Sequence, residues 1–348
     1  MLAEPNPVLG ADGRIHLAYE LLLLNPLPTP STVTRIEVLD AGHLAPVLAD
    51  LSGPALAAVL SPFGGGTGTT AGAGQAQRAV LDVSLPGTAR PRALVHRITV
   101  AEVPLPQLAN PFLAARTGVA ANRAIVLGPP LRGPRWVDFG GCCGPVEHRI
   151  AIQPLNGGLH VSQRFAVDIV RLGADGRLFD GPADQVASFP YYGAPVVAAA
   201  AGVVVAAQDD QPDQIPFQPT PPGEPRTILG NNVIVDIGHG RFTAYAHLKP
   251  GSVAVAVGAR VRAGQQLGLL GNSGNSDFPH LHFQVMDAPS ALASNGLPFV
   301  LRSFDSPGSV PPPDQIDVTQ PIPVRPILAG HFERVIPMNL QVMNFPNG

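Results

Sequence analysis

Two histidines separated by one residue lie in the segment Pro279-His280-Leu281-His282-Phe283. On a β-strand, residues i and i+2 point to the same face, about 7 Å apart along the chain. Both imidazoles would therefore face one space, where one could bind a metal while the other transfers a proton beside it. The preceding residues 271–276 contain only Gly, Asn and Ser. Such a run is typical of a loop that brings backbone close to a site.

The length, net charge and composition of the chain limit the functions to consider. It has 348 residues, a net charge of -3 and 14% charged residues. This length favours two domains, and the absence of a basic stripe argues against a nucleic-acid partner. No apolar run reaches the roughly 18 residues of a membrane span, and the first residues lack the features of a signal peptide. We therefore expect either a cytoplasmic chain or one whose export signal has been removed or left off.

The composition predicts an all-β protein. With 40 Pro and 38 Gly, the chain is expected to form many short strands joined by turns. Residues 1–132 are predicted to be an immunoglobulin-like β-sandwich that serves as an accessory or binding domain. Its expected strands cover residues 15–24, 32–39, 77–85 and 93–103. The scattered His16, His43 and His96 are interpreted as structural or surface residues.

Residues 133–305 are predicted to form a compact antiparallel β-sheet domain. Strands are expected at 146–152 and 161–170, with a hairpin between them at Asn156-Gly157, because Asn-Gly between apolar runs is a strong hairpin signal. A second hairpin is expected through Gly238-His239-Gly240, and a short strand at 253–257. Residues 306–348 are Pro-rich and predicted to be an irregular strap across the surface.

Three segments of the second domain carry a family resemblance. Asn231–Leu248 ends in Tyr-Ala-His-Leu, residues 257–265 read Val-Gly-Ala-Arg-Val-Arg-Ala-Gly-Gln, and residues 271–283 end in Pro-His-Leu-His-Phe. In this order they resemble the lysostaphin-type zinc endopeptidases, which cut peptide bridges in bacterial cell walls. Gly193-Ala-Pro-Val also resembles a strand of that family. The resemblance covers about residues 145–287 and leaves residues 1–132 unexplained.

The resemblance implies a set of roles. His282 and Asp168 would be ligands of Zn²⁺, His280 would handle protons, and His247 would be a second general base or a donor to the developing oxyanion. The implied substrate is a stem or cross-bridge peptide of peptidoglycan, and the implied location is periplasmic or extracellular. Imidazole suits the proton-transfer roles because its unperturbed pKa is near neutrality.

One position departs from the family pattern. The family usually has a ligand histidine four residues before the aspartate, where this chain has Arg164, which cannot bind a cation. On the predicted hairpin, His148 falls opposite residues 164–166 and could supply the missing imidazole. His160 is the alternative, although eight strand residues separate it from Asp168, about 26 Å. Cys143 is a third option, but the adjacent Cys142 and Cys143 fit a turn feature better.

Two other functions stay open. If Arg164 fills the cavity, no metal binds and the domain is a catalytically inactive wall-binding or regulatory module. A set of histidines on β-strands would also suit a cupin-like oxygenase, which would bind iron instead of zinc. The Gly-rich approach to Pro279 argues against that third function.

Overall fold

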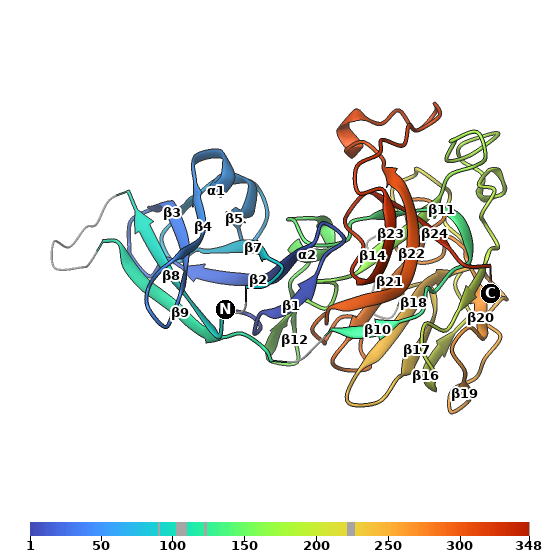
Figure 1. Ribbon diagram of the computed structural model, residues 1–348, viewed down its shortest axis with the longest axis horizontal. Coiled ribbons are helices and arrows are strands. Elements are labelled where there is room, and N and C mark those ends of the chain that lie inside the picture. Colours follow the sequence, from blue (N-terminus) through green and yellow to red (C-terminus); the bar gives the residue numbers. More distant parts are fainter. Residues whose placement is uncertain (90, 102–109, 122–123, 221–226, 348) are drawn as a thin grey trace. The chain divides into compact units, whose positions relative to one another are not determined.

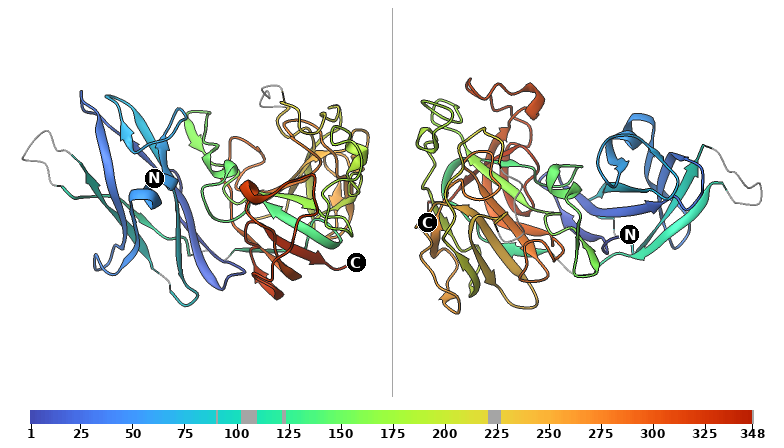
Figure 2. Two further views of the ribbon diagram at one scale, coloured as in Figure 1. Left: turned by 90° about the horizontal axis from the view of Figure 1, so that it is seen from above. Right: turned by 180° about the vertical axis from the view of Figure 1, so that it is seen from behind.

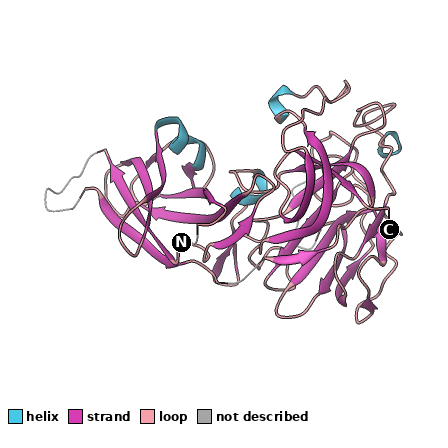
Figure 3. Ribbon diagram, viewed as in Figure 1, coloured by secondary structure: helices cyan, strands magenta, loops and turns pink. Residues whose placement is uncertain are grey.

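The computed structural model describes residues 1–89, 91–101, 110–121, 124–220 and 227–347. The chain divides into two compact units, each of which is described by itself. Unit 1 comprises Met1–Leu9, Gly13–Ala124 and Cys143–Ile150, and unit 2 comprises Gly10–Asp12, Ile125–Cys142 and Ala151–Gly348. The elements are mostly strands (Figures 1–3), which confirms the predicted all-β class. No helix among the described residues is long and apolar enough to cross a membrane.

Unit 1 is built from two antiparallel sheets, one in the order β1-β2-β7-β5 and one in the order β4-β3-β8-β9, with β6 paired to β3. Its elements are β1 (Asn6–Leu9), β2 (Arg14–Leu24), β3 (Ser31–Asp40), β4 (Val47–Ser52), α1 (Gly53–Val59), β5 (Leu60–Pro62), β6 (Thr70–Ala71), β7 (Ala76–Pro86), β8 (Ala93–Val100), β9 (Phe112–Gly118) and α2 (Glu147–Ile150).

The two sheets of unit 1 share one hydrophobic core. Leu17 and Tyr19 of β2 and Leu81 of β7 pack in the same cluster as Ile36 of β3 and Ile98 of β8. Because side chains alternate along a strand, the residues between these core positions face the other side of each sheet. The structure is thus a β-sandwich, and its immunoglobulin-like character stays a prediction.

Unit 2 contains one large sheet with the order β10-β22-β24-β11-β14-β21-β18-β17-β16-β19, to which β23 adds at β22. Its elements are β10 (Ile125–Leu127), β11 (Gly133–Phe139), β12 (Gln153–Leu155), β13 (Gly158–His160), β14 (Val167–Arg171), the 3-10 turn η1 (Val186–Ser188), β15 (Pro195–Val197), β16 (Gly202–Gln208), β17 (Asn231–Asp236), β18 (Phe242–Leu248), β19 (Arg260–Val261), β20 (Gln266–Leu269), β21 (Leu281–Met286), β22 (Phe299–Ser309), the 3-10 turn η2 (Pro313–Gln315), β23 (Gly330–Val335) and β24 (Gln341–Phe345).

The large sheet is antiparallel except where β10 runs parallel to β22. Its centre is β14-β21-β18, in which Asp168 is paired with His282 and His282 with Ala246. Tyr245 and Phe283 beside them are fully buried, with ring centroids 5.3 Å apart. The central strands are therefore held on a packed apolar base.

Several predicted elements are wrong in detail. Residues 147–150 form the short helix α2 and not a strand, and the strand expected from 161 begins only at Val167, after a turn. The predicted strand at 253–257 does not form. In Figure 1, β23 and β24 lie beside β22 in the segment expected to be an irregular strap. The consecutive apolar residues Val342 and Met343 of β24 are both buried and pair with β11.

Candidate metal centre

Asp168 and His282 face each other across two neighbouring strands. Asp168 is the second residue of β14 and His282 the second residue of β21, and the two are directly paired. His282 Nδ1 lies 2.8 Å from Asp168 Oδ1. His282 is buried, while the Asp168 side chain is 28% exposed. A carboxylate and an imidazole thus converge at a point that solvent can reach.

His280 joins this pair from the start of β21. It forms a bridge with Gly271 just before the strand, and its Nε2 lies 3.4 Å from the same oxygen of Asp168. His280 Nδ1 lies 2.8 Å from the carbonyl oxygen of Phe278 and donates to it. The i, i+2 spacing therefore directs both imidazoles to one carboxylate.

His247 reaches the cluster because its backbone is in the left-handed region. Strict alternation after Ala246, which pairs with His282, would direct His247 to the opposite face. Its φ of 59° breaks that alternation. The ring centroid of His247 lies 4.6 Å from that of His280 and 5.8 Å from that of His282. Such a conformation is uncommon outside glycine and is often found at functional sites.

Each of the three imidazoles has one nitrogen occupied by a fixed partner. His247 Nδ1 donates to the carbonyl of Ser273 at 2.8 Å, and His280 Nδ1 donates to Phe278 as described. His282 Nε2 donates to Gln284 Oε1 at 2.7 Å. The opposite nitrogens, His247 Nε2, His280 Nε2 and His282 Nδ1, then carry lone pairs.

These tautomers fit a cation. With Nε2–H bonded to Gln284, the lone pair of His282 Nδ1 points at a carboxylate oxygen only 2.8 Å away. Two acceptors at this separation repel each other unless a proton or a metal ion lies between them. Imidazole and carboxylate are both common Zn²⁺ ligands, so Asp168 and His282 could hold that ion.

Electrostatics keep His247 neutral. Burial lowers its pKa well below the usual value, and the positive charges that His280 and His282 can carry lower it further. The carboxylate of Asp168 and the hydrogen bond to Ser273 raise the pKa, but they are the smaller effects. His247 therefore presents an unprotonated Nε2 at neutral pH.

The residues expected near Asp168 lie in different places. Arg164 is buried in the turn before β14, and its Nη1 donates to the carbonyl of Gly296 at 3.2 Å. His160 ends β13, and its Nε2 donates to Leu155 at 3.1 Å. In the described part of the chain, His160 belongs to no group of three potential ligand atoms within 4.8 Å of one another.

His148 lies on α2 in unit 1, so the strand argument for it is wrong. The hairpin turn at Asn156-Gly157 forms as predicted, but its ladder ends at the pair of Gln153 and His160. The role of His148 as a metal ligand stays a prediction.

The model of peptidase family M23 matches residues 186–294, which include His247, His280 and His282. Residues 186–294 thus belong to peptidase family M23. This confirms the family resemblance of the sequence motifs. Asp168 lies before the matched segment and enters the site through the pairing of β14 with β21.

Two curated proteins are similar to part of the chain. The chain is 42% identical to "Cell division protein DipM" of Caulobacter vibrioides over 62 residues, 18% of this chain and 10% of that protein. It is 39% identical to "Peptidoglycan DD-endopeptidase ShyA" of Vibrio cholerae over 57 residues, 16% of this chain and 13% of that protein. The similarity thus spans only about a tenth of the length of either relative.

Solved structures of the family are also similar. The catalytic domain of lysostaphin from Staphylococcus simulans is 24% identical, with a TM-score of 0.27 over 47% of this chain and 88% of that one. The catalytic domain of the M23 protein EnpA from Enterococcus faecalis is 20% identical, with a TM-score of 0.26 over 47% of this chain and 85% of that one.

Loops of unit 2 hold His247 and His280 in place through residues that were not predicted from the sequence. Ser273 accepts from His247 through its carbonyl and donates through its hydroxyl to Leu248 at 2.7 Å. Ser276 contacts His280 Nδ1 at 3.2 Å and donates to Asn272 at 2.6 Å. Gln284 could have been found, because it lies two residues after His282 on the same face of β21.

An aromatic cluster lies next to His280. Phe278, Phe217, Phe189 and Phe179 form a chain of ring contacts with centroids 5.3–6.3 Å apart, and the Phe278 ring is 6.2 Å from that of His280. Phe217 and the nearby Ile215 are exposed. An apolar surface is thus available beside the histidines.

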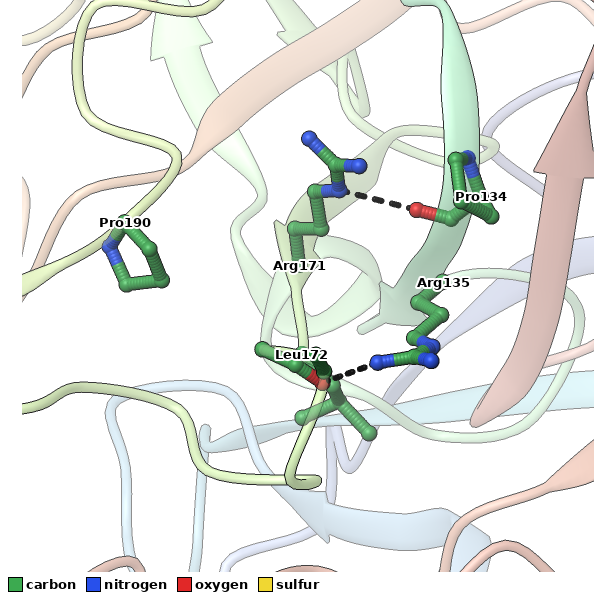
Figure 4. Close-up of a pocket in the computed structure, with 7 residues that line it drawn as sticks. Pro134, Arg135, Arg171, Leu172 and Pro190 are labelled. Atoms are coloured by element: carbon green, nitrogen blue, oxygen red, sulfur yellow. Dashed lines mark hydrogen bonds between the residues drawn. The ribbon is translucent and has the colours of Figure 1, made fainter.

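A separate pocket in unit 2 contains none of the site residues. Figure 4 shows its wall of Pro134, Arg135, Arg171, Leu172 and Pro190, and its volume is about 320 Å³. Arg171 donates to Pro134 at 2.9 Å, and Arg135 donates to Gly173 at 2.6 Å. Both guanidinium groups thus bind backbone carbonyls, and we assign no chemistry to this pocket.

Proposed function

We propose that the M23 domain is a zinc-dependent endopeptidase that hydrolyses stem or cross-bridge peptides of bacterial peptidoglycan. The convergence of Asp168, His247, His280 and His282 on three adjacent strands carries this proposal. ShyA, whose name describes it as a peptidoglycan endopeptidase, supports the choice of substrate. A cell-wall substrate implies a periplasmic or extracellular location.

The proposed ligands are Asp168, His282 and a third imidazole from His148. Arg164 cannot replace it, and His160 is bonded within its own hairpin. When bound, Zn²⁺ would polarise the scissile carbonyl and lower the pKa of a water molecule. Three protein ligands with one open position are the usual arrangement for that chemistry.

The remaining histidines would move protons. His280 Nε2 lies beside Asp168 and can accept a proton because its Nδ1–H is held by Phe278. His247 Nε2 can act as a second base and, once protonated, as a donor to the developing oxyanion. The aromatic cluster from Phe278 to Phe179 would bind apolar parts of the substrate.

A metal and cleavage assay tests the proposal. We expect the purified protein to bind about one equivalent of zinc and to release peptides from peptidoglycan, and His282→Ala to lose both. His239→Ala is the matched control, because His239 lies in the exposed turn after β17. Normal peptide release by the metal-free His282→Ala protein would refute zinc-dependent catalysis.

One alternative function is a wall-binding module without activity. It is favoured because Arg164 stands where the family usually has a ligand histidine. That function predicts no zinc binding between about pH 6 and pH 8, together with binding to peptidoglycan that does not need His282. The third ligand has its own test. We expect His148→Ala to lose zinc and His160→Ala to keep it, and the reverse result would exclude His148.

A further inference from the structure

The outer face of a sheet in unit 1 carries polar groups that are buried or only partly exposed. On β2 and β7, core residues such as Tyr19 and Leu81 alternate with His16, Glu20 and Asp82 on the other face. Ala18 pairs with Asp82, which makes His16 and Asp82 diagonal neighbours. His16 Nδ1 lies 2.9 and 3.1 Å from the two oxygens of Asp82, and His16 is only 3% exposed.

Cys143 lies beside this pair. The only two cysteines of the chain, Cys142 and Cys143, are joined in a disulfide. One potential ligand atom each of His16, Asp82 and Cys143 lies within 4.8 Å of the other two. A thiolate, an imidazole and a carboxylate together are a ligand set that suits zinc. In the disulfide, however, the sulfur of Cys143 is not a thiolate.

The backbone of Cys143 is held in place independently of the disulfide. Arg149 Nη1 donates to the carbonyl of Cys143, and Nη2 donates to Tyr19 at 3.1 Å and Leu81 at 2.8 Å. Tyr19 and Leu81 belong to the same strands as His16 and Asp82. The guanidinium thus attaches the cysteine segment to the sheet, and opening the disulfide would leave these bonds intact.

The charge of Arg149 does not oppose a cation there. Its Nη2 forms an ion pair with Glu20 at 3.0 Å, and both side chains are at most 1% exposed. The pair is neutral as a whole. Asp82 and a thiolate of Cys143 would therefore give the site a net negative charge, which favours a divalent cation.

We propose that reduction of the Cys142–Cys143 disulfide creates a second metal site in unit 1, formed by His16, Asp82 and Cys143. A dithiol reductant would supply two electrons and two protons and be oxidised to its own disulfide, while the S–S bond of the protein becomes two thiols. The thiol of Cys143 then loses its proton as it binds Zn²⁺ or Co²⁺. Reduction of the disulfide would thus enable metal binding at this second site.

Cobalt binding to the full chain tests this site. In a His282→Ala background, which removes the first proposed site, we add Co²⁺ with and without a phosphine reductant. We expect about one equivalent of Co²⁺ and a thiolate-to-cobalt absorption band only in the reduced protein. The band is specific because the chain has no cysteines other than Cys142 and Cys143.

Two matched cysteine variants decide the result. Cys142→Ser cannot form the disulfide and should show the band without reductant, whereas Cys143→Ser should never show it. His16→Gln and Asp82→Asn in the Cys142→Ser background should each weaken the band. Circular dichroism checks that each variant is folded. If Cys142→Ser does not fold, Cys142→Ala replaces it in the experiment. A folded Cys142 variant without the band, or a band that survives in Cys143→Ser, would overturn the proposal.

Discussion

The nitrogen that each histidine offers to the site is set by the partner of its other nitrogen. Phe278 and Ser273 do this through backbone carbonyls, whereas Gln284 does it through its side chain for His282. A partner of this kind orients a metal-binding imidazole and increases its basicity. Because the partner of His282 Nε2 is a side chain, a substitution can remove it.

We expect Gln284→Leu to lower the zinc affinity by about 10- to 100-fold, because His282 would lose the acceptor that fixes its tautomer. Gln284→Glu is the matched control, since it retains an oxygen acceptor and should retain affinity. Competition with a chromogenic chelator measures both. Equal affinities of the Leu variant and the wild type would show that Gln284 does not position His282.

The buried residue His96 makes the stability of unit 1 depend on pH. His96 is fully buried, its Nε2 lies 2.8 Å from the hydroxyl of Tyr19, and burial lowers its pKa. Below the unfolded-state pKa of about 6.5, the unfolded chain binds a proton that the folded chain does not. The free energy of unfolding therefore decreases as pH falls through this value, by up to about 1.4 kcal/mol per pH unit.

We expect His96→Gln to remove this part of the pH dependence, because Gln keeps a hydrogen-bonding group but does not titrate. Denaturant unfolding of the two proteins at several pH values between about 5 and 8 measures the difference. If the curves of the variant and the wild type stay parallel below pH 6.5, His96 is not the cause.

At the scale of elements, the site depends on the close contact of two loops. A Cβ atom on Gly274 would lie 2.2 Å from the nitrogen of Gly230, and Gly274 has a φ of 79°. Between these loops, Ser273 Oγ accepts from the backbone of Asn231 at 2.9 Å. Residues 271–276 are thereby held where Ser273 can accept from His247.

We expect Gly274→Ala to destabilise unit 2 and to weaken metal binding, because the added methyl group would separate the loops. Gly238→Ala is the control, since Gly238 also has a positive φ of 87° but a Cβ atom there would have no neighbour within 4 Å. The control should cost only the backbone strain, about 1–2 kcal/mol, without affecting the metal. Equal losses of stability in thermal unfolding would argue against loop contact as the cause.

At the scale of the whole molecule, each compact unit is built from segments that are not consecutive in the chain. Unit 1 includes Cys143–Ile150, although residues 125–142 before them belong to unit 2. The returning segment brings Arg149, which is the buried partner of Glu20. The predicted domain boundary at residue 132 remains a proposal, and fragments can test it.

We expect a fragment of residues 1–150 to be more stable than one of residues 1–132. The shorter fragment leaves the carboxylate of Glu20 without Arg149, and breaking a buried ion pair costs about 3–5 kcal/mol. Glu20→Gln in the shorter fragment should recover part of the loss. Thermal unfolding of the three fragments is the measurement, and equal stability of the first two would show that residues 143–150 are dispensable.

The sequence by itself determined the strand content and the main motif. Strand-like runs bounded by turn residues located β2, β3, β7 and β8, and Asn156-Gly157 located a hairpin, because these signals depend on local geometry alone. The i, i+2 spacing of His280 and His282 likewise placed both rings on one face. Residues 146–152 were predicted wrongly, and the strap expected at 306–348 contains the strands β23 and β24, because tertiary pairing and packing outweigh local propensity there.

Only the tertiary structure decided which residues meet. The pairing of Asp168 with His282 joins positions 114 residues apart, the left-handed backbone of His247 overrides its expected face, and Arg149 connects Cys143 to the sheet of His16 and Asp82. None of these follows from a local pattern, because each depends on the register between distant strands or on a backbone conformation that the surrounding packing imposes.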